Sequence, residues 1–178
     1  YTDLRALLGA VAPLAAAPDQ AALARAEKVL VSLDVSGAHR LVLVDGVFAP
    51  TLSDATPEAG VSVRTLAEML DDPKIEARAD LLRTSVASDA MISLNAAMAT
   101  DGVVIDVAAK VTLAKPLHIV HIATQSKAAV FTRSLVKIEA GAHATLLESF
   151  VAAEGASAYQ VHDSLVLWAG EGADVVMP

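Results

Sequence analysis

The sequence predicts a mainly β protein, a parallel β-helix that follows a small N-terminal α-helical region. Two observations favour this fold class. Short strands rich in Val, Ile and Leu follow one another from Asp101 onward, and motifs within them recur at a long, near-constant interval. Repeats of about 20–50 residues without helical periodicity are typical of stacked β-strand coils. We therefore predict an N-terminal region over residues 1–100, with a hairpin at 40–49, and the first coils of a truncated β-helix over residues 101–178.

Recurring motifs set the expected spacing of the coils. Ser134–Val136 recurs as Ser164–Val166, Gly141–Ala142 as Gly172–Ala173, and Ile105–Asp106 as Ile138–Glu139, so the numbering shifts by 30, 31 and 33 in turn. In such strands one set of side chains points into a narrow core. The residues that we expect in this core are Val103, Ile105, Ile119, Leu135 and Leu146. Gly46 and Gly102 are expected in turns.

The N-terminal region predicts helices around one hairpin. Pro18-Asp19 opens a helix over residues 20–33, in which apolar residues from Leu23 to Leu33 recur on one face. Further helices are expected at 4–8 (capped by Thr2-Asp3), 63–70, 74–83 and 88–99. Between them, Asp45-Gly46 separates two apolar runs. Asp-Gly readily adopts the positive φ of a tight turn, so this pattern predicts the hairpin.

Composition and charge exclude several classes of protein. The chain has no cysteine, which excludes disulfides and thiolate ligation of a metal or an iron–sulfur cluster within it. A net charge of −8 disfavours nucleic acid as a partner. No apolar run approaches the roughly 20 residues of a membrane span. Tyr1–Arg5 lacks the pattern of a signal peptide, and Tyr1 in place of Met indicates that the natural N-terminus is missing.

Histidines are the first candidate metal ligands. His118 and His121 lie three apart in a predicted strand, so we expect one to face inward and the other outward rather than to share an ion. His39, His143 and His162 are expected at the surface or at corners. His162 precedes Asp163, but no serine in a nucleophile context accompanies the pair.

An enzyme that acts on acidic polysaccharide is the main alternative to a structural protein. Such a site needs carboxylates on one face, often around Ca²⁺. Asp106, Glu139 and Ala169 occupy comparable places in the repeats, so this acidic row stops after two members. The single tryptophan, Trp168, is expected in the core or on a sheet face, and so few aromatic residues disfavour a sugar-binding cleft.

Phosphate-binding glycine motifs are absent, since Gly170-Glu-Gly172 lacks a third glycine and a following helix. The chain is therefore not expected to bind ATP by itself. We predict no catalytic, cofactor-binding or metal-ligating residue in it. A self-assembling structural β-helix is a further alternative.

Several segments together resemble the SufB/SufD family of iron–sulfur cluster assembly proteins, and within it the SufD subunits. These segments are Tyr1–Arg5, His39–Phe48 with Leu52-Ser53, Leu94-Asn95, Thr100–Val104, Leu113–Leu117 with His121-Ile122, and Glu139–Ala142 with Ala144–Glu148. Their order and joint presence carry the resemblance, which covers nearly the whole chain.

The resemblance implies a right-handed parallel β-helix preceded by a small helical region with a β-hairpin. It also implies a non-catalytic scaffold of the cytoplasmic SUF system, which pairs with a SufB-like paralogue and a SufC-like ATPase. In the family the cluster forms at the SufB–SufD interface, and FAD has been associated with the complex. The C-terminal segment that carries these contacts has no counterpart here. No cofactor is therefore expected in this part of the protein, and a homo-oligomer is left open.

Overall fold

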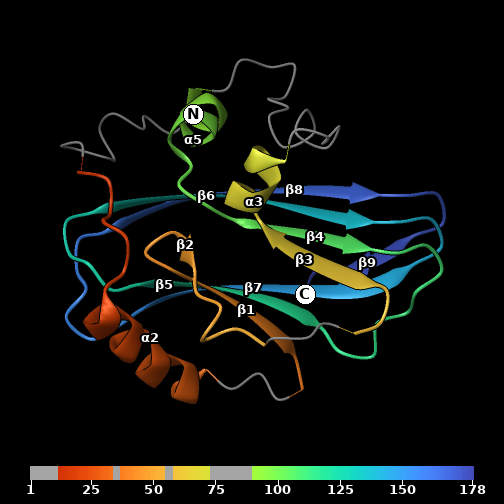
Figure 1. Cartoon of the computed structure of the whole chain (residues 1–178), viewed down its shortest axis with the longest axis horizontal. Helices are drawn as coiled ribbons and strands as arrows, with labels where there is room; N and C mark the ends of the chain where they lie inside the picture. The colour runs from red at the N-terminus through yellow and green to blue at the C-terminus, as the bar shows by residue number, and fades with distance from the viewer. Residues whose placement is uncertain (1–11, 34–36, 55–57, 73–89) are drawn as a thin grey trace.

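The computed structural model describes residues 12–33, 37–54, 58–72 and 90–178, and it shows two β-sheets that lie face to face (Figure 1). The helices are α2 (Gln20–Ser32), α3 (Leu66–Asp71) and α5 (Ala90–Met98). The strands are β1 (His39–Val44), β2 (Val47–Phe48), β3 (Val61–Thr65), β4 (Val103–Val107), β5 (Leu117–Ala123), β6 (Ala129–Ile138), β7 (His143–Ala152), β8 (Gln160–Ala169) and β9 (Asp174–Val176). The protein is thus mainly β with a few helices.

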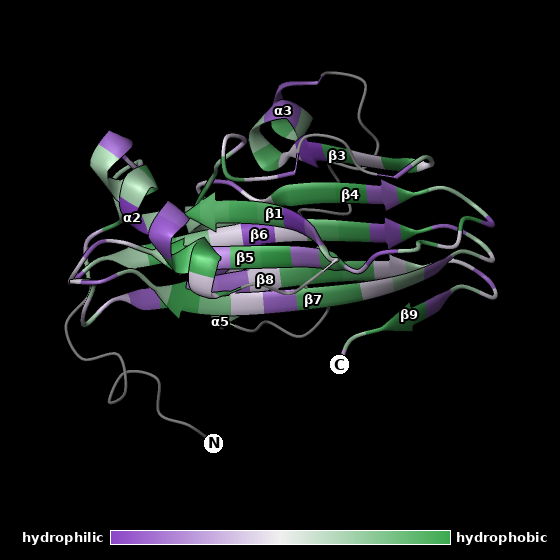
Figure 2. Cartoon of the chain, turned by 90° about the horizontal axis from the view of Figure 1, so that it is seen from below, coloured by the Kyte–Doolittle hydropathy of each residue, from purple (hydrophilic) through white to green (hydrophobic). Residues whose placement is uncertain are grey.

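Successive strands from β4 onward alternate between the two sheets. One sheet has the order β3-β4-β6-β8 and the other the order β2-β1-β5-β7-β9. Neighbours pair in parallel, except that β2 and β3 are antiparallel to β1 and β4, so both sheets are mixed. Figure 2 shows the long strands of both sheets running side by side, with β9 short at one edge. No helix in the described part of the chain has the length and hydropathy needed to cross a membrane.

The register between neighbouring strands corrects the spacing predicted from the motifs. Val104 pairs with Leu135, and Leu135 pairs with Val166, so the numbering shifts by 31 at each step. Gly141 and Gly172 obey this shift, with φ of +67° and +66° in equivalent turns. The other two predicted shifts, 30 and 33, are wrong by one position and by two. Since side chains alternate along a strand, an error of one position aligns residues whose side chains lie on opposite faces of the sheet.

The main core lies between the sheets, and two smaller clusters lie on their outer faces. Val103, Ile105, Ile119 and Leu146 belong to the inter-sheet core, as predicted, and each is at most 2% exposed. Leu135 is also buried, but on the outer face of its sheet, where α3 covers it. Leu41 and Leu43 of β1 belong to the inter-sheet core too, so residues on either side of position 100 share it. The domain boundary at residue 100 stays a prediction.

Helix α2 and the hairpin confirm the sequence prediction. The carboxylate of Asp19 accepts a hydrogen bond from the backbone N–H of Ala22 at 2.7 Å and so caps α2. Ala26 and Leu30 pack this helix on the outer face of the β1–β5–β7 sheet (Figure 1). In the hairpin, Asp45 and Gly46 have φ of +48° and +83°, as a two-residue turn requires.

The helix predicted at 63–70 is half wrong, because β3 covers its first residues. Val61 and Val63 alternate with polar residues and pair with β4, and α3 begins only at Leu66. Thr65 and Glu68 form a capping box at this point. Helix α5 lies within the helix predicted at 88–99. The helices predicted at 4–8 and 74–83 fall outside the described residues.

The prediction that Gly102 lies in a turn is wrong. Its φ is not positive, but a Cβ atom on it would lie 1.9 Å from the carbonyl oxygen of Arg133. The glycine is therefore required by the close approach of the backbone to β6, whereas Gly46 does occupy a turn.

Candidate functional site

A polar cluster lies between the two sheets, at positions that continue the apolar core. On β5, His121 lies two residues after the inward-facing Ile119. On β7, Glu148 lies two residues after the inward-facing Leu146, and on β8, Asp163 lies two residues before the inward-facing Leu165. The Nε2 atom of His121 is 3.1 Å from Oε1 of Glu148 and 3.9 Å from Oδ1 of Asp163. Three strands from both sheets therefore bring one imidazole and two carboxylates together.

Neighbouring side chains fix the orientation of this cluster. The Thr132 hydroxyl on β6 donates a hydrogen bond to Oδ1 of Asp163 at 2.6 Å. The Phe150 ring stacks on the imidazole of His121, with centroids 4.6 Å apart and an interplanar angle of 12°. His121 is only 4% exposed, and its Nδ1 atom is buried without a hydrogen-bond partner among the described residues. The imidazole thus directs its other nitrogen, Nε2, to the carboxylates.

Burial controls the protonation of Asp163. Loss of solvent raises the pKa of this carboxyl above its ordinary value, and the adjacent Glu148 carboxylate adds to the rise. His121 and the Thr132 hydroxyl act in the opposite direction without reversing it. Two carboxyl groups this close together favour a shared proton or another cation between them. Among the described residues this is the set of three His, Asp or Glu side chains that could ligate a metal ion.

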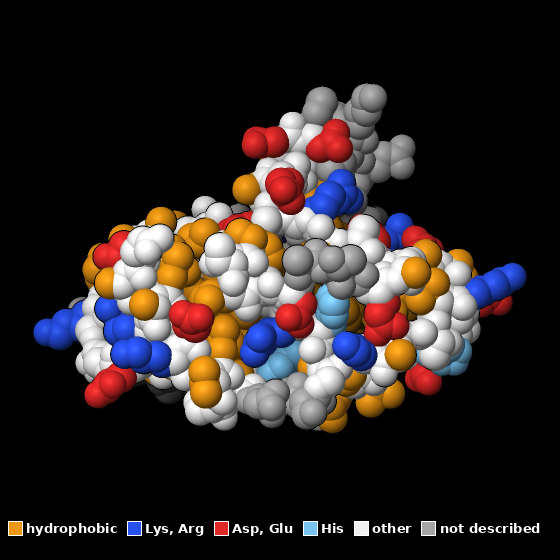
Figure 3. All heavy atoms as spheres, turned by 60° about the horizontal axis from the view of Figure 1, so that its bottom comes forward, with side chains coloured by type: hydrophobic (Ala, Val, Ile, Leu, Met, Phe, Trp, Pro, Cys, Tyr) orange, Lys and Arg blue, Asp and Glu red, His pale blue; other side chains and the backbone are white. Residues whose placement is uncertain are grey.

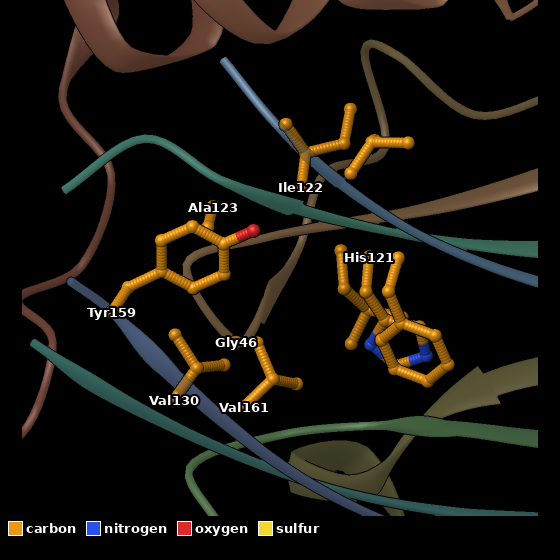
Figure 4. A pocket seen from close by; sticks show the side chains of 10 residues that line it. Gly46, His121, Ile122, Ala123, Val130, Tyr159 and Val161 are labelled. Carbon is orange, nitrogen blue, oxygen red and sulfur yellow. The ribbon is translucent and has the colours of Figure 1, made fainter. Parts of the chain in front are cut away.

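A small pocket reaches the imidazole of His121 from the end of the sheets (Figure 4). Figure 4 shows Gly46, Val130, Tyr159 and Val161 among the residues that line it. Its volume is about 10 Å³, which is room for about one water molecule. The cluster is therefore close to solvent, although the imidazole itself is buried.

His118 lies on the opposite face of β5 from His121, so the predicted separation of these two histidines is confirmed. Its Nε2 atom is 2.9 Å from the hydroxyl oxygen of Ser149 on β7. Burial, and to a lesser extent the charge of Arg40 on β1, lower the pKa of His118. His118 is 2% exposed, so the outward-facing histidine is buried as well.

Of the remaining histidines, only His143 lies at the surface as predicted, with Nδ1 3.5 Å from Oδ2 of Asp174. The prediction is wrong for His39, which is buried with Nε2 unpaired among the described residues. His162 is half-buried and stacks on Phe131 with ring centroids 4.5 Å apart, and burial lowers its pKa. It faces away from Asp163, whose nearby imidazole is that of His121.

Helix α5 is held on the outer face of the other sheet by Asn95. The side-chain amide nitrogen of Asn95 donates hydrogen bonds to the carbonyl oxygens of Thr132 and His162 at 2.9 and 2.8 Å. Its amide oxygen accepts from the Arg133 guanidinium at 3.2 Å, and Arg133 also donates to Ser164 at 3.1 Å. Burial lowers the pKa of Arg133, although the nearby Asp163 charge opposes this. This network joins a helix to two strands and has the features of a structural contact.

The predicted acidic row is replaced by a row of mixed charge. Asp106 pairs with Lys137, and Lys137 pairs with Trp168, so Ala169 lies one position beyond this row, beside Ile138, and Glu139 lies two positions beyond it. The ammonium of Lys137 lies 2.9 Å from Glu139 and 5.2 Å from the centre of the Trp168 ring. Trp168 is 45% exposed and lies on a sheet face. Figure 3 likewise shows acidic and basic side chains interspersed on one face of the molecule.

Comparison with known proteins identifies the family. No curated protein matches the chain. The family model described as the SufBD protein N-terminal region matches residues 2–119, from the N-terminal segment into β5. This match supports a role in iron–sulfur cluster assembly by the SUF system. Because the match spans well over half of the sequence, the chain belongs to the SufB/SufD protein family.

Proposed function

We propose that this chain is the N-terminal part of a SufD-type subunit, a scaffold without catalytic activity of its own in cytoplasmic iron–sulfur cluster assembly. The observation that carries the proposal is the match of the SufBD N-terminal region over residues 2–119. The residues that resemble SufD subunits extend beyond that match to Glu148, and this supports the choice of SufD within the family.

The scaffold is proposed to be a right-handed parallel β-helix. Parallel strands alternate between two facing sheets, and the register shifts by the same amount from β4 to β6 as from β6 to β8, which supports successive coils of such a helix. Connections between parallel strands of one sheet are right-handed in about 98% of cases, which supports the handedness. The glycine turns at Gly141 and Gly172 are equivalent corners of two coils.

The proposed mechanism is positional. A core of closely packed Val, Ile and Leu side chains between the sheets makes the coils stiff. A stiff stack holds a distal partner-binding domain in a fixed place, so that ATP hydrolysis by a SufC-like partner moves the interface with a SufB-like paralogue. The iron–sulfur cluster, and FAD where it is present, belong to that assembled complex rather than to this part of the chain.

Co-expression tests the proposal. The full-length gene product is tagged and expressed with the SufB-like and SufC-like proteins of the same organism, and the eluted complex is weighed by native mass spectrometry. A complex that contains all three is expected. Elution of the tagged protein alone, while the other two proteins are present and folded, would contradict the scaffold role. Pairing with a SufD-like paralogue in place of the SufB-like one would instead assign the chain as the SufB-type subunit.

A further inference from the structure

We propose that His121, Glu148 and Asp163 form a binding site for one divalent ion of a first-row transition metal, with one imidazole nitrogen and two carboxylate oxygens as ligands. This inference goes beyond the scaffold role and does not depend on it. It rests on the geometry, burial and donor chemistry of the cluster between the sheets.

The distances suit a common ion. The three ligand atoms lie within 4.8 Å of one another, and His121 Nε2 is 3.1 and 3.9 Å from the two carboxylates. Imidazole nitrogen and carboxylate oxygen bind such ions at about 2.0–2.2 Å, which places adjacent ligand atoms about 3.0–3.4 Å apart. A small rotation of the Asp163 or Glu148 side chain therefore completes the site without movement of the strands.

Neighbouring side chains orient two of the three ligands. The stacked Phe150 ring holds the plane of the imidazole, and Thr132 orients the carboxylate of Asp163 through a hydrogen bond at 2.6 Å. Such second interactions fix ligands before the ion binds. The buried imidazole has no hydrogen bond at Nδ1 among the described residues, so its polar contacts are the carboxylates at Nε2.

The charge of the cluster calls for a cation. Two carboxyl groups and an imidazole in the interior of the protein are costly unless a positive charge offsets them. A divalent ion within reach of His121, Glu148 and Asp163 would offset the charge of both carboxylates together.

Donor type and access select the class of ion. A mixed set of imidazole and carboxylate suits Mn²⁺, Fe²⁺, Co²⁺ or Zn²⁺, whereas Ca²⁺ and Mg²⁺ prefer oxygen ligands alone. The chain offers no thiolate for softer ions. The side chains of Glu148 and Asp163 are 19% and 10% exposed, which leaves a path for an ion and for water in its remaining positions.

Titration of the chelator-treated protein with Co²⁺ and Zn²⁺ tests the site, by calorimetry and by the visible absorption of bound Co²⁺. One equivalent is expected to bind, and Ca²⁺ is expected not to compete. Glu148→Gln and Asp163→Asn should each weaken binding at least tenfold. His143→Asn is the matched control, because it alters the surface pair with Asp174. Absence of stoichiometric binding, or loss of it in His143→Asn alone, would overturn the proposal.

Two further measurements separate binding from folding. Both neutral variants, Glu148→Gln and Asp163→Asn, should fold without metal, since they remove like-charge repulsion. Zn²⁺ should raise the melting temperature of the wild-type protein and of His143→Asn, but not of these two variants. In wild-type protein, substoichiometric Mn²⁺ should broaden the NMR signals of the His121 ring before those of His143. Broadening in the opposite order, or stabilisation of Glu148→Gln and Asp163→Asn by Zn²⁺ equal to that of the wild type, would contradict the site. The NMR measurement needs the wild-type protein alone, so it holds even if a variant fails to fold.

Discussion

Asp45, in the turn between β1 and β2, accepts hydrogen bonds from the backbone N–H and the side-chain hydroxyl of Thr124, at 2.7 and 2.5 Å. Gln125 donates a third at 3.1 Å, and Asp45 is only 2% exposed. The Asp-Gly turn that the sequence predicts is thus also an anchor: its Asp45 side chain connects the hairpin through hydrogen bonds to the segment that follows β5.

Replacement of Asp45 by Ala should therefore lower the free energy of unfolding by about 2–3 kcal/mol, because buried donors on Thr124 lose a charged acceptor. Asp45→Asn keeps the preference for positive φ and should lose about half as much. Urea denaturation measures both. Asp174→Ala, which alters a side chain that is 66% exposed, should change stability by less than about 0.5 kcal/mol. Equal losses in all three variants would exclude the anchor.

Gly102 and Gly172 require glycine for two different reasons, a close backbone contact at Gly102 and a positive φ at Gly172. Gly102→Ala places a Cβ atom 1.9 Å from the Arg133 carbonyl and should cost about 3 kcal/mol or more. Gly172→Ala meets no atom within 4 Å but has φ of +66°, so backbone strain alone should cost about 1–2 kcal/mol. Thermal unfolding of the two variants checks this order. The same cost for both would mean that β6 moves aside freely.

Local signals in the sequence predicted the elements that are formed by nearby residues. The helix Gln20–Ser32 has its N-cap, Asp19, directly before it, and the hairpin has its turn, Asp45-Gly46, between its two apolar runs. The strand β3 was missed because its residues Val61–Thr65 lead directly into the capping box of α3, so the helical signal extended backward over the strand. The period-two alternation in β3 becomes decisive only with β4 beside it.

The candidate site could not be predicted, because it depends on register. His121 and Glu148 are far apart in sequence, as are Thr132 and Asp163, so they meet only when the pairing of β5 with β7 and of β6 with β8 is known. The motifs that recur at shifts of 30 and 33 are one and two positions out of the observed register, so they align side chains that are not neighbours. An error of one position also assigns a side chain to the wrong face of the sheet. The alternation rule did separate His118 from His121 correctly, since it needs one strand only.

Ile105 tests the packing of the inter-sheet core. It is fully buried, so Ile105→Asp places an unpaired carboxylate among apolar side chains. The cost should approach the total stability of such a domain, about 5–15 kcal/mol, and the cooperative unfolding transition should disappear. Ile105→Val should cost only about 0.5–1.5 kcal/mol. Circular dichroism during heating measures both, and an unchanged melting temperature for Ile105→Asp would contradict the placement of this residue.

The neighbouring Asp106 provides the matched control for that experiment. Its side chain is 35% exposed and lies 3.7 Å from the Arg64 guanidinium at the surface. Asp106→Asn should therefore change stability by less than about 0.5 kcal/mol, because exposed ion pairs contribute little. A large loss in this variant would mean that β4 tolerates no change at all, and the effect of Ile105→Asp would then say nothing about the core.

Protonation of His118 should make the protein less stable in weak acid. Burial and the nearby Arg40 lower its folded-state pKa below 6.5, so the unfolded chain binds a proton first as the pH falls. The contribution of this neutral imidazole is complete above about pH 6.5 and is lost as the pH falls toward the folded pKa. One such group gives a slope of at most about 1.4 kcal/mol per pH unit.

His118→Gln removes the titration and can keep a hydrogen bond to Ser149. Urea denaturation between about pH 7.5 and 5 spans the ordinary pKa of histidine, about 6.5. The free energy of unfolding should decline less steeply over this interval for the variant than for the wild type. His143→Gln, at a side chain that is 50% exposed, should follow the wild-type curve. If His118→Gln declines as steeply as the wild type, another group, such as the half-buried His162, whose pKa burial also lowers, carries the acid sensitivity.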